Sequence, residues 1–115
     1  MDINLKRIYE EPSKSDGTRI LVDRIWPRGI KKENVRLDDW IQEIAPSTEL
    51  RKWFDHKDER FPLFREKYRR ELDTQQELIK ILLTHAKQSK LTLLYGAKNT
   101  EHNQAIVLKE YLEDL

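Results

Sequence analysis

Cysteine is absent from this chain of 115 residues, and glycine occurs only three times. Without cysteine the chain has no disulfide, no thiolate nucleophile and no thiolate metal ligand, which fits a reducing cytoplasm. Glycines at 17, 29 and 96 cannot form the GxGxxG or GxxxxGK[ST] loops that cradle phosphates. The three histidines lie far apart and include no His-x-x-x-His pair, so the sequence predicts no metal site, and no motif indicates a cofactor.

Long apolar runs are also missing, since none approaches the roughly 20 residues that a membrane span needs. The first seven residues mix acidic, basic and apolar side chains where a signal peptide needs an apolar core. We therefore expect a cytoplasmic protein with no membrane partner. The length predicts one domain, residues 1–115. Nothing in the sequence indicates an oligomeric state.

Net charge is small, because 22 basic residues are balanced by 21 acidic ones. A net charge of +1 counts against nucleic acid as an obligatory partner. The charge is unevenly placed, however. Residues 19–36 carry six basic and two acidic side chains, a net charge of +4, whereas residues 101–115 carry one basic and four acidic ones, a net charge of −3. The basic stretch keeps open an alternative function in nucleic-acid binding or transcriptional regulation.

Three segments have the pattern of strands. Residues 3–9 alternate loosely between apolar and polar side chains, which predicts a half-buried edge strand. Residues 18–23 are predicted as a strand because an apolar run at 20–22 lies between the turn pair Asp16-Gly17 and Trp26-Pro27, and a long hairpin with the first strand is possible. Residues 91–95 are apolar without alternation and end at a glycine, which indicates a central parallel strand buried on both faces.

Helical patterns fill most of the remaining chain. Between residues 37 and 44 the apolar side chains recur at i, i+3, i+4 and i+7, which predicts a short helix. Ser47 or Thr48 can cap the next helix, and residues 61–72 follow with Pro62 tolerated in the first turn. These patterns place Trp40 and Trp53 on the apolar faces of their helices.

Two more helices are expected toward the end of the chain. Thr74 and Glu77 have the spacing of a capping box at the start of one. The last runs from about residue 101 to 113 and is capped by Asn99 or Thr100. The elements together predict an α/β fold: a single small domain with a short, at least partly parallel sheet covered by helices.

If strands 18–23 and 91–95 are parallel, their carboxyl ends lie at one edge of the sheet, where ligands bind in open α/β sheets. The first turn of the last helix would add unpaired amides that favour an anion. We therefore expect a site for a small anionic, nucleotide-like ligand, either binding or catalytic. Its expected ligand-binding residues are Arg24, Trp26, Arg28, Tyr95, Lys98, Asn99 and Asn103, and its expected catalytic residues are His102, as acid or base, and Glu101.

Each of these assignments has a plainer alternative. Arg24 can pair with Asp23 or with a carboxylate of a packed helix, and Trp26 can pack in the core. His102 can be an exposed or capping residue, and His56 has no comparable polar neighbours and is expected on the surface. A protein-interaction domain without any ligand is a further alternative.

Three motifs together carry a resemblance to a known family. DGTRILVDRIWPRG at 16–29, APSTELRKWF at 45–54 and LTLLYGAKNTEHNQAIVL at 91–108 resemble the YeaO-like proteins of the domain-of-unknown-function 488 family. The resemblance spans nearly the whole chain. It implies a small cytoplasmic bacterial α/β protein whose biochemical role is not established, and some relatives carry the label of a MarR-type regulator. The chain shows no evident winged helix-turn-helix, which such a regulator needs.

Overall fold

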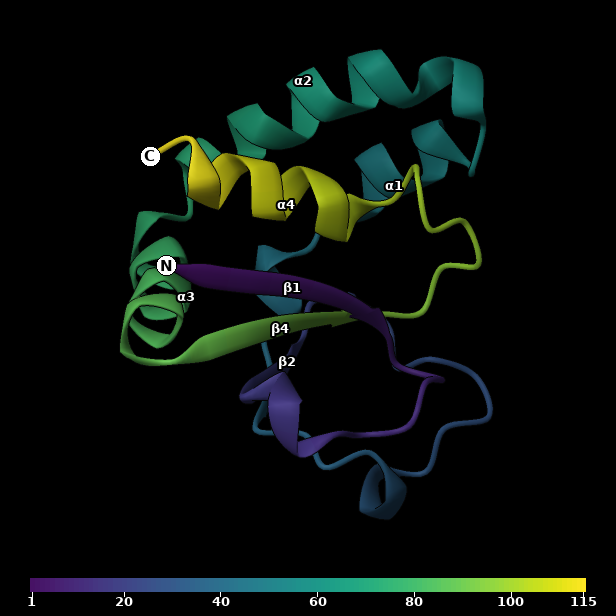
Figure 1. Ribbon diagram of the computed structural model, residues 1–115. Helices are drawn as coiled ribbons and strands as arrows, with labels where there is room; N and C mark the ends of the chain where they lie inside the picture. The colour runs from purple at the N-terminus through teal and green to yellow at the C-terminus, as the bar shows by residue number, and fades with distance from the viewer.

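The computed structural model describes residues 1–115 as one α/β domain built on a four-stranded parallel sheet (Figure 1). The strands are β1 (Asp2–Arg7), β2 (Thr18–Leu21), β3 (Asp39–Trp40) and β4 (Lys90–Tyr95). Their order in the sheet is β1-β4-β2-β3, and every neighbouring pair is parallel. The α/β prediction, the edge position of β1 and the central parallel position of β4 are confirmed. The hairpin alternative was wrong, because β1 and β2 both pair with β4 instead of each other.

Four α-helices and four short 3-10 helices complete the chain. The α-helices are α1 (Thr48–Phe54), α2 (Phe61–Asp73), α3 (Gln76–Gln88) and α4 (Gln104–Glu113). The 3-10 helices are η1 (Lys14–Asp16), η2 (Lys32–Asn34), η3 (Gln42–Ile44) and η4 (Asp58–Arg60). None of the helices has both the length and the apolar character needed to cross a membrane.

Alternation along the strands separates two apolar clusters on opposite faces of the sheet. On one face Ile20, Leu91 and Leu93 join the helices in a cluster of 22 buried residues. On the other face Leu21 and Leu94 pack with the irregular segment that connects β2 to β3. The helices therefore cover one face, and a long loop covers the other.

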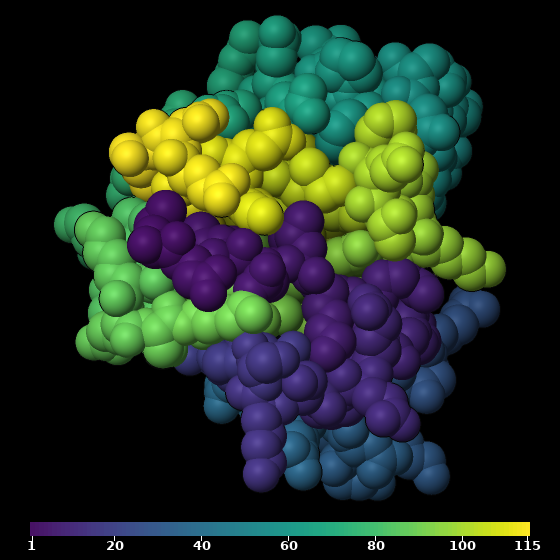
Figure 2. Space-filling view, in the orientation of Figure 1, coloured from purple at the N-terminus to yellow at the C-terminus, as the bar shows by residue number.

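The helices form two layers over the sheet. Helices α3 and α4 contact β1 and β4, and α2 packs on α4 from the side away from the sheet (Figure 1). The space-filling view shows the N-terminal strand beside the C-terminal helix (Figure 2). Because α1 packs on α2, its residues reach the carboxyl edge of the sheet from the outer helical layer.

The predicted helix over residues 37–44 was wrong. The segment forms β3 and η3, and its backbone is tied to β2 by hydrogen bonds from Asp38 N to Arg19 O (2.9 Å) and from Ile41 N to Leu21 O (3.1 Å). The apolar spacing misled because its members face opposite sides of the sheet. Leu37 and Trp40 pack with the small cluster, whereas Ile41 and Ile44 belong to the large one.

Two predicted helix starts were also wrong. Thr74 ends α2, and its hydroxyl donates to Glu71 O (2.7 Å), so it makes no capping box for α3. Helix α4 begins at Gln104 instead of residue 101, since the Asn99 side chain accepts hydrogen bonds from the amides of Glu101 and His102 and holds a separate turn there. The predicted N-cap Ser47 is confirmed for α1 by its bond from Leu50 N (3.1 Å).

Candidate functional site

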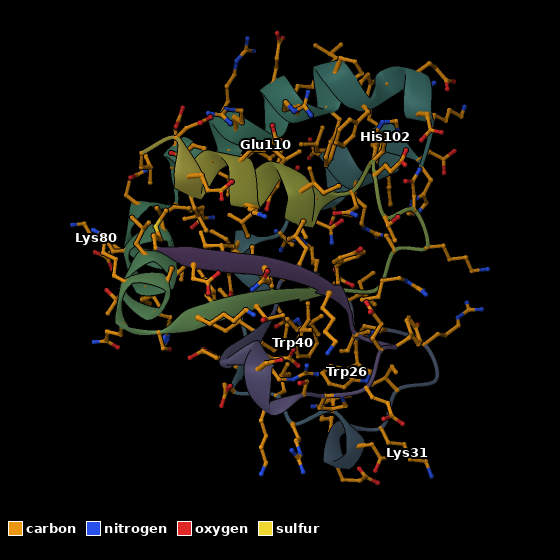
Figure 3. The ribbon with its side chains drawn as sticks, in the orientation of Figure 1. Trp26, Lys31, Trp40, Lys80, His102 and Glu110 are labelled. Atoms are coloured by element: carbon orange, nitrogen blue, oxygen red, sulfur yellow. The ribbon has the colours of Figure 1, made fainter.

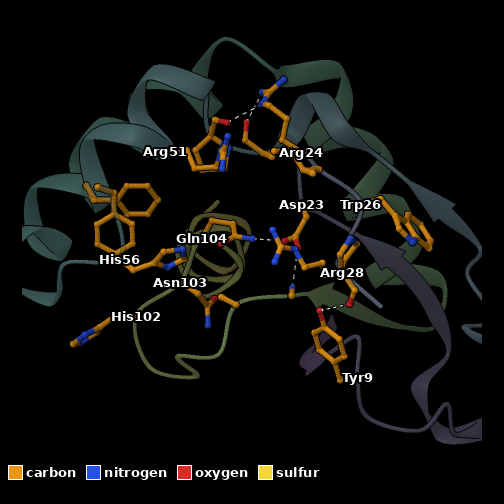
Figure 4. A pocket seen from close by; sticks show the side chains of 18 residues that line it. Tyr9, Asp23, Arg24, Trp26, Arg28, Arg51, His56, His102, Asn103 and Gln104 are labelled. Atoms are coloured by element: carbon orange, nitrogen blue, oxygen red, sulfur yellow. Dashed lines mark hydrogen bonds between the residues drawn. The ribbon is translucent and has the colours of Figure 1, made fainter. Parts of the chain in front are cut away.

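A cavity of about 430 Å³ lies at the carboxyl edge of the sheet, between the ends of β2 and β4, the end of α1 and the start of α4 (Figure 4). Its apolar wall includes Ile25, Pro27, Phe54 and Phe64. Its polar wall includes three arginines, two histidines and a single carboxylate, that of Asp23. The volume is within the range of pockets for small organic ligands.

Asp23 follows β2 and joins three segments of the cavity wall. Its carboxylate accepts a hydrogen bond from Gly96 N (2.8 Å) and another from the Gln104 side chain (Figure 4). Glycine is needed at 96, because a Cβ there would lie 2.9 Å from the Asp23 carboxylate. Burial raises the pKa of Asp23 to about 6, although the two hydrogen bonds oppose that rise. The group therefore titrates near neutral pH.

Arg24 lines the cavity, but much of its hydrogen-bonding capacity is used by the protein. Its Nε donates to Pro46 O (2.9 Å) and its Nη2 to Ala45 O (2.9 Å). These bonds hold the segment before α1 against the end of β2. Neither of the expected pairings with a carboxylate occurs, and the main role visible for Arg24 is to fix the backbone of the cavity wall.

Arg28, Arg51 and His56 form the rim of the cavity, and their side chains make no hydrogen bond or ion pair within the protein. All three residues are exposed. Only the backbone carbonyl of Arg28 is bonded, by the Tyr9 hydroxyl (2.8 Å). His56 reaches the rim because Asp55 and His56 both adopt left-handed backbone angles, with φ of 48° and 54°. The rim thus has two guanidiniums and one imidazole that are free of partners in the protein.

His102 lies at the edge of the cavity, with its ring directed away from Asp23 (Figure 4). Its Nδ1 is 2.9 Å from Asp58 Oδ1, and its ring stacks on Phe61 with a centroid separation of 4.6 Å. The side chain is 37% exposed. Asn99 donates to the same Asp58 oxygen (2.9 Å), so this group of residues ties the β4–α4 loop to η4.

Trp26 packs mainly in the small cluster, as its plainer alternative supposed. Its indole donates to Ile30 O (2.7 Å), and its ring meets Trp40 edge-on at a centroid distance of 5.2 Å. Both rings lie on the other side of the sheet from His102 (Figure 3). Lys32 Nζ stands 5.3 Å from the Trp26 ring centroid, a cation–π contact. Trp40 and Trp53 are half-buried.

The structure brings together five of the nine predicted site residues. Those that line the cavity are Arg24, Trp26, Arg28, His102 and Asn103. Asn103 is 1% exposed and caps α4 by accepting from Ile106 N (3.0 Å). The residues outside the cavity lining are Tyr95, Lys98, Asn99 and Glu101. Tyr95 is buried, and Lys98 and Glu101 are exposed.

Four polar residues of the cavity were absent from the predicted set. Asp23 was expected at this edge of the sheet but was given no role in the site, and Gln104 adjoins the predicted Asn103. Arg51 and His56 come from α1 and the turn after it. Their sequence contains no feature that would place them beside β2. Only the packing of α1 on α2 brings them to this edge.

The basic stretch at 19–36 does not form one basic surface. Arg19 is 4% exposed, pairs with Asp16 (2.5 Å) and donates to the Val35 carbonyl (2.9 Å). Arg24 is directed at backbone carbonyls and Lys32 at the tryptophans. The local excess of basic residues therefore has several separate structural roles. No group of three or more His, Cys, Asp or Glu side chains is arranged to hold a metal ion.

Fold and site together define a small parallel α/β domain with a cationic cavity at the carboxyl edge of its sheet. The chain belongs to the domain-of-unknown-function 488 family, because the model described as "Inactive DUF488-N3 subclade" matches residues 2–115. The resemblance inferred from the three sequence motifs is confirmed.

Its relatives have no stated activity. The chain is 51% identical to the uncharacterized protein YeaO of Escherichia coli strain K12, over the full length of both chains. It is 36% identical to the uncharacterized protein Rv3073c of Mycobacterium tuberculosis, across 96% of this chain and 92% of that protein. The same values hold for the uncharacterized protein Mb3100c of Mycobacterium bovis. No solved structure matches the chain.

Proposed function

We propose that the protein binds a small organic anion in the cavity at the carboxyl edge of the sheet and does not transform it chemically. The observation that carries this proposal is the pair of free guanidiniums at the rim, Arg28 and Arg51, which have no carboxylate or carbonyl partner. Guanidiniums bind carboxylates and phosphates through paired hydrogen bonds. A ligand with two anionic oxygens would give each of them a partner.

The apolar wall favours a ligand with an organic body. The apolar wall is formed in part by Phe54, Phe64 and Pro27. A bare inorganic ion would leave these apolar surfaces in contact with water. Anion binding to the rim and burial of a planar or aliphatic body against this wall would act together. A nucleotide-like anion satisfies both requirements, and so does an organic phosphate or carboxylate of similar size.

Binding without catalysis is supported by the position of the one predicted acid or base. His102 has its Nδ1 on Asp58 and its ring on Phe61, so it is held at the edge of the cavity, away from the rim arginines. The subclade whose model matches the chain is described as inactive. Asp23 is the titratable group that faces the cavity more directly, and bonds from Gly96 N and the Gln104 side chain hold its carboxylate in place.

A thermal-shift and calorimetric screen tests the proposal with inorganic phosphate, nucleoside monophosphates and alkyl phosphates as probes. Binding to the folded state raises the apparent stability in proportion to ln(1 + [L]/Kd). Arg28→Gln and Arg51→Gln should each weaken binding about tenfold or more, the usual effect of losing a hydrogen bond to a charged group. Arg70→Gln is the matched control, since Arg70 is an exposed arginine of α2 outside the cavity.

Equal affinity in the parent, Arg28→Gln and Arg51→Gln would contradict the proposal. Preferential binding of duplex DNA, with affinity falling steeply as salt rises, would instead favour the nucleic-acid alternative. The cytoplasmic location expected from the cysteine-free sequence stays a prediction that fractionation of the native host cell would test.

A further inference from the structure

The carboxylate of Asp23 is an unusual component of a cationic cavity, because no cation neutralises it. Asp23 takes part in none of the five ion pairs of the chain. The adjacent Arg24 directs its Nε and one terminal nitrogen to the carbonyls of Pro46 and Ala45. The guanidiniums of Arg28 and Arg51 are also without a carboxylate partner, although all these residues line one cavity.

Acceptor capacity remains on this carboxylate. An ionised carboxylate has about four acceptor positions, and the protein fills one on each oxygen, from Gly96 N and from the Gln104 side chain. The free capacity belongs to a group that lines the cavity. Asp23 is half-buried, and a carboxylate that is partly removed from water without a cation is costly unless a donor or a cation comes to it.

We propose that the cavity selects a small zwitterionic ligand, whose anionic group binds Arg28 and Arg51 and whose protonated amino group binds Asp23. This inference rests on the proposed function, because it assigns the second half of the same ligand. Asp23 is half-buried near the end of β2, whereas Arg28 and Arg51 are exposed, so the amine of the ligand would point toward the sheet and its anionic group toward solvent. The apolar wall at Phe54 and Phe64 contacts the part between them.

Calorimetric titration with two matched series of probes tests this inference. One series consists of alkyl phosphates of increasing chain length, and the other of ω-aminoalkyl phosphates of the same lengths. At about pH 7.5 we expect at least one aminoalkyl phosphate to bind about tenfold or more tightly than its alkyl counterpart, as a charge-assisted hydrogen bond would give. Asp23→Asn should abolish this advantage, so that the aminoalkyl phosphate and the alkyl phosphate of the same length bind equally in the variant.

Asp23→Asn is a near-isosteric variant, and Gln104 can turn its amide so that its carbonyl accepts from the new Asn side chain. If that variant does not fold, titration of the unmodified protein at about pH 5, where Asp23 is protonated, replaces it. The amine advantage should fall there too. The other charged and titratable groups around the cavity are Tyr9, Arg24, Arg28, Arg51, His56, His102 and, behind the wall, Tyr68, and comparison with the matched alkyl phosphate cancels their effects on the shared phosphate group.

The outcomes separate the two proposals. Equal binding of the two series, abolished by Arg51→Gln, would overturn the zwitterion inference and leave the anion site standing. An amine advantage that survives in Asp23→Asn would also overturn it, since another group would then bind the amine. Failure of every probe in both series to bind would overturn the inference together with the anion site on which it rests.

Discussion

The inner wall and the rim of the cavity differ in how fully their polar side chains are satisfied by the protein. On the inner wall Asp23 and Arg24 each make two hydrogen bonds that join separate segments, and Asn103 makes two that hold the start of α4. On the rim Arg28 and Arg51 have side chains without any partner in the chain. The wall therefore holds the cavity in shape, and the rim has donors available for a ligand.

This difference shows that position at the edge of a sheet is not sufficient to assign a role. Arg24 and Arg28 are close in sequence and line the same cavity, yet one binds the backbone and the other is free. Free hydrogen-bonding capacity, more than location, distinguishes the residues that a ligand can use. Substitutions in the wall should alter stability, and substitutions in the rim should alter binding.

Arg24→Ala should have the largest effect on stability. It removes two hydrogen bonds from a charged donor and leaves the carbonyls of the buried Ala45 and Pro46 without their partner. We expect the free energy of unfolding to fall by about 3 kcal/mol, measured by urea denaturation. Arg24→Lys should recover only part of the loss, since one ammonium lacks the forked geometry of a guanidinium. A loss as small as that of Arg28→Ala would remove the distinction between wall and rim.

Asp23→Asn should change the pH dependence of stability. The pKa of about 6 in the folded protein exceeds the ordinary value of 3.8 for an aspartate, so the folded state holds this proton more tightly. The associated stability is fully present below about pH 4 and is lost as pH rises through 6, a change of about 3 kcal/mol at 1.36 kcal/mol for each pH unit. Asp23→Asn has no carboxyl group at this position, so it does not lose this stability as the pH rises.

The measurement is the difference in unfolding free energy between Asp23→Asn and the parent, taken from about pH 4 to pH 7.5. The variant should become more stable relative to the parent as the pH rises. Taking the difference cancels the contributions to stability of the titratable groups that the two proteins share. A difference that does not vary with pH would mean that Asp23 has an ordinary pKa and is better solvated than its place in the wall suggests.

Much of the fold could be predicted because the sequence pattern of its strands indicates how they are buried. Residues 91–95 are apolar on both sides, and the structure buries all five. The segment 37–44 could not be predicted in the same way, because helical spacing and burial on two opposite faces produce the same sequence pattern there. Pairing with β2 decides between them, and that pairing involves residues about 20 positions away.

The residues of the candidate site that follow the strands could be predicted from the sequence, whereas those from α1 and the turn after it could not. Arg24, Arg28 and Asn103 follow directly from the rule that parallel strands end at one edge. His56 reaches the cavity through two consecutive left-handed residues, and although Asp and His adopt such angles more often than most residues, their sequence does not require them there. Arg51 depends on how α1 packs on α2, a tertiary arrangement that the local sequence does not specify.

Asn103→Ala tests a smaller contribution of the wall. The side chain caps α4 through Ile106 N (3.0 Å) and donates to Asn99 O (2.9 Å), so its loss leaves an amide of the first turn without a partner. We expect a loss of about 1 kcal/mol in unfolding free energy, the typical value of an N-cap. Asn103→Asp should keep the cap and most of the stability, and a full loss in that variant would point to the bond with Asn99 as the main contribution.

Arg28→Gln and Arg51→Gln should have the smallest effects on stability, because neither side chain has a partner to lose. Each should change the unfolding free energy by no more than about 0.5 kcal/mol, as is usual for exposed positions without special contacts. Glutamine keeps most of the aliphatic stem, so the change isolates the charged group. The same two variants should weaken binding of alkyl phosphates about tenfold or more. Stability lost without any loss of binding would reverse the comparison, since the rim would then hold the fold and the anion would bind elsewhere.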